Sequence, residues 1–156
     1  MSPLKSPTHI TQTGLGYCLP ACAQMALAQL GIDETQQALA ETLGTRTGIG
    51  TPFSRIERLA AWSVEVRVTE WGGVDALETA LAGEAAVIAA VVTSPKLPGW
   101  PNLRTQHTVL IVGIDAEQVT YHDPALTYGP VSTSRGEYLL AWSEMSELVA
   151  FLTRLQ

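Results

Sequence analysis

Hydrophobic and polar residues follow two different periods along this chain, and the period changes near residue 62. Before that point apolar residues recur at helical spacing; Pro20 suits the first turn of a helix, and Gly31 and Gly44 suit helix ends. After it, valines alternate with polar residues over residues 64–69, as in a half-buried strand. The pattern predicts helices over residues 19–30, 34–43, 52–62, 75–81 and 136–142. It predicts strands over residues 64–69, 85–92, 107–114, 118–122 and 147–152.

Three segments have no regular period. Residues 1–11 form an extended arm that contains prolines, residues 44–51 form a glycine-rich loop, and residues 94–104 contain three prolines and form a long loop. We expect the two loops to form walls of a substrate cleft, since the second one ends just before His107. There is no internal repeat or linker. The sequence therefore predicts one α+β domain over residues 1–156, with N-terminal helices packed on an antiparallel sheet.

Composition and charge narrow the possible partners. Of 156 residues, 46% are apolar and 15% are charged, which is typical of a globular protein with a real core. The formal net charge is −6 and no Lys or Arg cluster is present, which argues against nucleic acid and anionic membrane surfaces as partners. The longest apolar run, residues 85–92, is far shorter than the roughly 20 residues that span a bilayer. The N-terminus lacks the apolar region of a signal peptide, so we expect a cytoplasmic protein.

The chain has only two cysteines, Cys18 and Cys22. Four residues apart on one helix face, they are poorly placed for a disulfide, and both are expected to stay free in a reducing compartment. Structural zinc needs four ligands in local pairs, so a site built from these thiols and a histidine is the least favoured interpretation. Cys22, flanked by small and apolar residues, is interpreted as a small hydrophobic core residue. No cofactor is predicted.

Cys18 stands where the first helix begins, and Gln12 lies six residues before it. The unpaired N–H groups at a helix N-terminus favour a thiolate, the form of cysteine that acts as a nucleophile. The intervening turn holds Gly14 and Gly16, so the Gln12 amide is able to fold back over the thiol. With the Cys18 backbone N–H it would form an oxyanion hole. Either residue alone has an ordinary explanation, as a core thiol or a solvated amide; the pair favours catalysis.

A histidine and a carboxylate are brought together by the predicted hairpin. His107 opens one strand and Asp123 follows the next, so antiparallel pairing places both at one edge of the sheet. Asp123 would then orient His107 as the general base for Cys18. The alternatives are a structural strand histidine and an aspartate that only starts a turn. His122 is a rival base but should point to the opposite sheet face, and His9 is expected to be solvated.

These residues form an ordered set of motifs. Gln-x5-Cys is followed by Cys-x2-Ala-Cys-x2-Met, which begins at Cys18, and then by His-x-Val and Asp-Pro. The set resembles the bacterial papain-like cysteine peptidases of the bacteriocin-processing, double-glycine leader type. The resemblance implies a papain-like fold and cleavage of a peptide or protein after a Gly-Gly leader. It also implies Cys18 as nucleophile, His107 as base, Asp123 as orienting residue and Gln12 as oxyanion donor.

The chain departs from that family at two positions, and other functions remain open. Tyr17 stands where the family often has Asp, and Leu19 stands where it usually has Gly, which would add bulk beside the thiol. We expect a stand-alone member, without the transporter domains that often follow this peptidase. One alternative is a peptide-binding or regulatory domain of the same fold with little or no turnover. Another is a different acyl transfer on the same scaffold, such as deamidation or transpeptidation.

Overall fold

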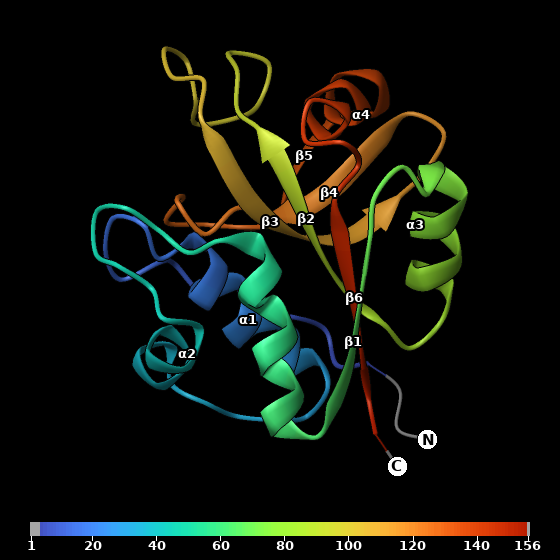
Figure 1. Ribbon diagram of the computed structural model, residues 1–156. Helices are drawn as coiled ribbons and strands as arrows, with labels where there is room; N and C mark the ends of the chain where they lie inside the picture. The colour runs from blue at the N-terminus through green and yellow to red at the C-terminus, as the bar shows by residue number, and fades with distance from the viewer. Residues whose placement is uncertain (1–3, 156) are drawn as a thin grey trace.

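The computed structural model describes residues 4–155, which form four α-helices, one 3-10 helix and six β-strands (Figure 1). The helices are α1 (Cys18–Gln29), α2 (Gln36–Leu43), the 3-10 helix η1 (Phe53–Trp62), α3 (Gly73–Ala82) and α4 (Arg135–Ser143). The strands are β1 (Val64–Thr69), β2 (Ala86–Val92), β3 (Gln106–Ile114), β4 (Gln118–His122), β5 (Val131–Ser134) and β6 (Val149–Arg154). Within residues 4–155 no helix is both long enough and apolar enough to cross a bilayer.

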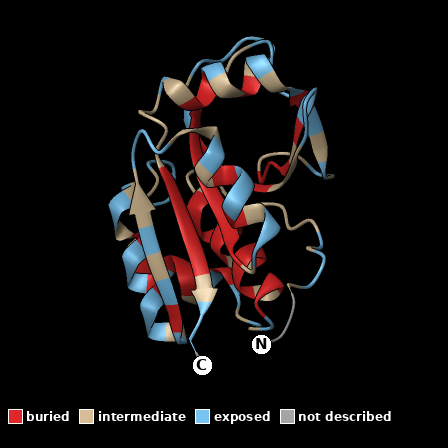
Figure 2. Cartoon of the chain, turned by 90° about the vertical axis from the view of Figure 1, so that its right-hand side faces the viewer, coloured by how far each residue is buried: buried red, intermediate tan, exposed pale blue. Residues whose placement is uncertain are grey.

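The six strands form one antiparallel sheet in the order β1-β6-β2-β3-β4-β5. The last strand along the chain, β6, lies between β1 and β2, and its first four residues are buried. Figure 2 shows the buried strands in the middle of the molecule. The sheet is therefore complete only when the C-terminal strand β6 has paired with both β1 and β2.

Helices cover both faces of the sheet. Alternate residues of β2 point to opposite sides: Ile88 packs with α1, α2 and η1, whereas Val87 packs with α3 and α4. Because β2 is buried on both faces, it has no polar side chains, as predicted. The predicted packing of the N-terminal helices on an antiparallel sheet is confirmed, and α3 and α4 form a second helical layer on the opposite face (Figure 1).

The predicted elements are present, most of them with ends shifted by one or two residues, and there are three further differences. Residues 53–62 form a 3-10 helix in place of an α-helix. β5 was not predicted, because its sequence Val-Ser-Thr-Ser has only one apolar residue. The last strand begins at Val149 and not at residue 147, because Ser146 and Glu147 adopt left-handed φ values of 59° and 51° and form a turn.

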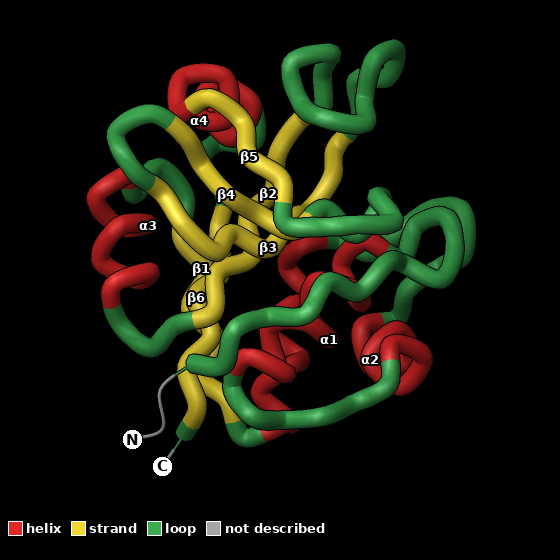
Figure 3. The backbone as a smooth tube through the Cα atoms, turned by 180° about the vertical axis from the view of Figure 1, so that it is seen from behind, coloured by secondary structure: helices red, strands yellow, loops and turns green. Residues whose placement is uncertain are grey.

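The N-terminal arm is extended, as predicted, and is bound along its length. Lys5 N donates to Gln29 O, and Gln12 N donates to Pro124 O at 2.8 Å. Thr11 Oγ1 donates to Leu126 O at 2.8 Å. Seen from behind, the arm passes over α1 as a loop (Figure 3). It thus connects the helical layer to the turn that follows β4.

Candidate active site

Cys18 is the first residue of α1, one position before the predicted start of this helix. Gly16 has φ +84° and Tyr17 is the N-cap, so the chain turns sharply immediately before the thiol. Cys18 is half-buried and lines a cleft, whereas the next two residues of the helix are buried. The thiol therefore combines access to substrate with the electrostatic field of a helix N-terminus.

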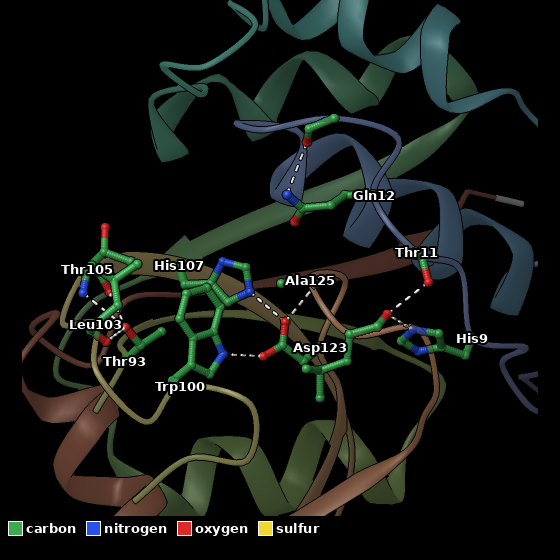
Figure 4. Close-up of polar contacts among 12 residues, drawn as sticks. His9, Thr11, Gln12, Thr93, Trp100, Leu103, Thr105, His107, Asp123 and Ala125 are labelled. Carbon is green, nitrogen blue, oxygen red and sulfur yellow. Dashed lines mark hydrogen bonds and ion pairs between the residues drawn. The ribbon is translucent and has the colours of Figure 1, made fainter. Parts of the chain in front are cut away.

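His107 and Asp123 form a buried hydrogen-bonded pair at one edge of the sheet, as the hairpin predicted. His107 Nε2 lies 2.6 Å from Asp123 Oδ1, and both side chains are at least 95% buried. The backbone N–H of Ala125 donates to the same oxygen at 2.9 Å (Figure 4). Since Asp123 occupies Nε2, the Nδ1 atom of His107 is the nitrogen left for proton exchange with a thiol.

The thiol and the imidazole shift each other's protonation. Burial alone would raise the pKa of Cys18, but hydrogen bonding and Coulombic attraction to His107 outweigh it, and the pKa falls below the ordinary thiol value. Burial would likewise lower the pKa of His107, but its bonds to Asp123 and Cys18 raise that pKa to about 9. His107 and Trp100 lower the pKa of Asp123 against the effect of burial. Both shifts favour a thiolate beside an imidazolium over a neutral thiol beside a neutral imidazole.

Gln12 lies in the same cleft as Cys18 and His107. Its Nε2 donates to Gly14 O at 3.0 Å, which folds the side chain back over the turn before Cys18. In Figure 4 its amide lies above the His107 ring, across from Asp123. Gln12 Oε1 is buried and has no hydrogen-bond partner among the described residues. One N–H of the amide is engaged, so the second is available to a substrate oxygen.

The cleft has a volume of about 610 Å³. The glycine-rich loop forms one wall through residues 48–51, and the proline-containing loop forms another through Trp100 and Leu103, as predicted. Leu15 and Ile49 are each 76% exposed at its rim. Among the described residues that line it, none is Lys, Arg, Asp or Glu. The cleft thus offers apolar walls around one polar reaction centre.

A larger hollow of about 850 Å³ lies between the arm, α1 and the start of α2. None of its described lining residues is a cysteine or a histidine. It therefore lacks the thiol and the imidazole that the smaller cleft brings together, and the smaller cleft is the candidate active site. No three His, Cys, Asp or Glu side chains in residues 4–155 are grouped so that they would hold a metal ion.

Two expectations about neighbouring residues were wrong. Leu19 does not crowd the thiol: its side chain is 1% exposed and packs in the core beneath α1, because successive helix residues point about 100° apart. His9 is not solvated: its Nδ1 lies 3.0 Å from His122 Nδ1, and its Nε2 lies 2.8 Å from Leu126 O. His122 contacts His9 and does not line the cleft, as its strand position predicted. Cys22 is fully buried, as predicted.

Trp100 is the site residue that the sequence did not reveal. Its indole Nε1 donates to Asp123 Oδ2 at 2.7 Å, and its ring packs against His107 with centroids 4.8 Å apart (Figure 4). The residue lies in an irregular loop, where no period indicates which way a side chain points. The only available signal was a large aromatic residue in a loop just before the candidate base.

Two solved structures share this architecture over nearly their whole length. A C39-like peptidase from Bacillus anthracis matches with a TM-score of 0.74 and 14% identity, over 96% of this chain and 98% of the other. The peptidase domain of Streptococcus ComA, a bifunctional ABC transporter involved in a quorum-sensing pathway, matches with a TM-score of 0.73 and 18% identity. That match covers 96% of this chain and 99% of the domain. The fold is therefore that of the papain-like peptidases.

The sequence itself identifies the family. The model of the Peptidase C39-like family matches residues 5–149, and the chain belongs to this family. No curated protein sequence matches it significantly. Family and fold together support a peptidase function in general.

Proposed function

We propose that this protein is a cysteine peptidase in which Cys18, His107, Asp123 and Gln12 carry out the reaction. The observation that supports this most is geometric: Cys18, the first residue of α1, and His107, held by Asp123 at 2.6 Å, line the same cleft. The pKa of the thiol is lowered and that of the imidazole is raised to about 9, the directions that such a pair requires. Perturbed groups that face each other in a cleft are typical of a nucleophile and its base.

The geometry supports acyl transfer in two steps. The Cys18 thiolate attacks the carbonyl carbon of the scissile peptide bond, and the resulting oxyanion accepts hydrogen bonds from the Gln12 amide and the Cys18 backbone N–H. The His107 imidazolium donates its Nδ1 proton to the leaving amine, which departs and leaves a thioester on Cys18. Neutral His107 then takes a proton from water, whose oxygen attacks the thioester. The carboxylic acid leaves and the thiolate–imidazolium pair is restored.

We further propose a peptide substrate with small residues before the scissile bond, Gly-Gly being the first choice. The family resemblance supports this preference, and so does a cleft whose lining includes Gly16, Gly48 and Gly50 together with Cys18. The uncharged lining favours apolar residues further along the peptide. Two free thiols fit a reducing compartment, and we propose the cytoplasm.

The inactive-domain alternative has lost its support, because Leu19 lies in the core and leaves the cleft open. Transfer to an amine remains a variant of the same chemistry, since it shares the thioester. Hydroxylamine detects the shared thioester by converting it to a hydroxamate. Competition between water and an added peptide amine then distinguishes the two reactions, because preferential use of the amine reports a transferase.

The test is cleavage of a peptide panel that contains Gly-Gly sequences and their Val-Val counterparts. We expect the parent to cleave Gly-Gly peptides, Cys18→Ala to abolish cleavage, and Cys22→Ala, which removes the other cysteine, to retain it. Mass spectrometry of acid-quenched reactions should detect the acyl group on Cys18. Cleavage that persists in Cys18→Ala would overturn the proposal.

A further inference from the structure

The carboxylate of Asp123 accepts hydrogen bonds from three donors. Oδ1 accepts from His107 Nε2 and from Ala125 N, and Oδ2 accepts from Trp100 Nε1 at 2.7 Å. Asp123 is only 2% exposed, so water does not replace a missing donor. Without the indole N–H, Oδ2 would be a buried carboxylate oxygen without a partner, which is costly for a charged group.

Trp100 also contacts the second member of the pair. Its ring packs against the His107 ring at a centroid distance of 4.8 Å and an angle of 58°. One side chain therefore restricts rotation of the carboxylate through a hydrogen bond and rotation of the imidazole through packing (Figure 4). Both restrictions keep His107 Nδ1 aimed toward the cleft.

The loop that carries Trp100 is held in place at its base and near its tip. At its base, Thr93 Oγ1 donates to Leu103 O at 2.7 Å and accepts from Thr105 N at 2.9 Å. Near its tip, Gly99 lies so close to the Leu126 side chain that a Cβ atom would be 2.3 Å from Leu126 Cδ2. Leu126 belongs to the turn that follows Asp123. The loop is thus docked on the segment that presents the carboxylate.

We infer that Trp100 is a positioning residue: through Asp123 and His107 it holds the base in the orientation that activates Cys18, and it makes the 94–104 loop part of the reaction centre. The inference rests on the proposed function, because it assigns roles to the same triad. A purely structural role for the indole would require only its bulk. The positioning role requires its N–H group, and this difference can be measured.

The experiment compares Trp100→Phe with Trp62→Phe. Trp62 Nε1 also donates to a carboxylate, Glu34 Oε2 at 3.2 Å, and neither residue lines the cleft, so this variant removes the same kind of bond elsewhere. Iodoacetamide alkylation of Cys18 is followed against pH by mass spectrometry. We expect Trp100→Phe to slow alkylation at pH 7 at least about tenfold, the value of a hydrogen bond to a charged group, and to raise the half-point of the profile. Trp62→Phe should match the parent.

A second measurement does not depend on reactivity. In the proton NMR spectrum the short His107–Asp123 hydrogen bond should give a downfield resonance, which we expect to be lost or shifted in Trp100→Phe and kept in Trp62→Phe. If Trp100→Phe fails to fold, benzothienylalanine at position 100 keeps the indole shape and replaces only the N–H by sulfur. We expect this variant to show the same changes in the alkylation profile and in the downfield resonance.

The results separate this inference from the proposed function. An unchanged alkylation profile and an unchanged downfield resonance in a folded Trp100 variant would overturn the positioning role while Cys18→Ala still abolishes cleavage. Cleavage that survives Cys18→Ala would overturn the proposed function instead, whatever Trp100 does. A lower half-point in Trp100→Phe would also contradict the positioning role, because it would mean that the indole opposes the thiolate.

Discussion

The Nδ1 atoms of His9 and His122 lie 3.0 Å apart, and this contact joins the N-terminal arm to the last residue of β4. The Nε2 atom of His9 lies 2.8 Å from Leu126 O, so this nitrogen carries the proton that it donates. Only one of the two facing Nδ1 atoms carries a proton in a hydrogen bond between them. Burial and then the electrostatic effect of His9 lower the pKa of His122.

This pair predicts a loss of stability in mild acid. A histidine with a lowered pKa in the folded state binds fewer protons than the unfolded chain, so its contribution is present above the ordinary value of about 6.5 and is lost as the pH falls. His107 acts in the opposite sense, because its raised pKa stabilises the fold in acid. We expect His122→Asn to flatten the fall of Tm between about pH 7 and pH 5. A parent and variant with parallel Tm curves would contradict this.

The Cys18–His107 pair predicts a pH profile in which the reactivity of the thiol reaches a plateau below the ordinary thiol pKa. Alkylation of Cys18 should begin well below the ordinary thiol pKa of about 8.5, because the imidazolium stabilises the thiolate. Peptide cleavage should fall again as the pH passes about 9, where His107 loses the proton that the leaving amine needs. His107→Ala should return Cys18 to ordinary behaviour, and His122→Ala serves as the control. An ordinary thiol profile in the parent would mean that the pair does not form.

The position of Gln12 predicts a loss of turnover without a loss of substrate binding. Removal of one oxyanion donor typically lowers kcat by about 10²–10³-fold. We therefore expect this decrease for Gln12→Ala, with KM changed little. Gln106 also lines the cleft but is exposed, so Gln106→Ala is the matched control and should retain kcat. Equal effects of the two substitutions on kcat would exclude the oxyanion role.

The burial of Leu19 predicts an effect on stability. Leu19→Ala should lower the free energy of unfolding by about 2–5 kcal/mol, the usual cost of such a truncation in a core. Because the side chain faces away from the cleft, the pH profile of Cys18 alkylation should keep its half-point. Urea denaturation gives the first quantity and mass spectrometry the second. A large shift of the half-point with little loss of stability would place Leu19 beside the thiol after all.

The turn before Cys18 predicts that alanine substitution has different effects at two glycines. Gly16 and Gly48 both have positive φ, +84° and +79°, so alanine strains either backbone. Only at position 16 would the new Cβ meet backbone atoms, at 2.8 Å from Gly50 N and 3.1 Å from Arg46 O. We expect Gly16→Ala to lower Tm much more than Gly48→Ala and to slow Cys18 alkylation. Similar effects in both variants would show that the turn adapts.

Local pattern was sufficient to predict the parts of the site that lie within one hairpin or one helix start. The β3–β4 pairing brings His107 and Asp123 together at short sequence separation, and Pro20 with the following small residues marked the start of α1. The closeness of α1 to that edge of the sheet depends on tertiary packing. It came from the family resemblance and not from periodicity.

What the sequence did not show depends on contacts between irregular segments. Trp100 reaches Asp123 because its loop docks on the 123–126 turn, and His9 reaches His122 because the arm crosses the same region. Neither segment has a period that fixes side-chain direction. The strand order, with β6 between β1 and β2, was also beyond local pattern, because antiparallel partners far apart in sequence leave no local trace.

The place of β6 has a consequence for the newly made chain. The nucleophile leaves the ribosome long before His107, and the sheet that holds His107 lacks an interior strand until residues 149–154 have been synthesised. Until then Cys18 lacks the base that we propose for it. The proposed hydrolytic activity would therefore arise only after residues 149–154 have been synthesised, and a chain interrupted before that point would not cut itself or its neighbours.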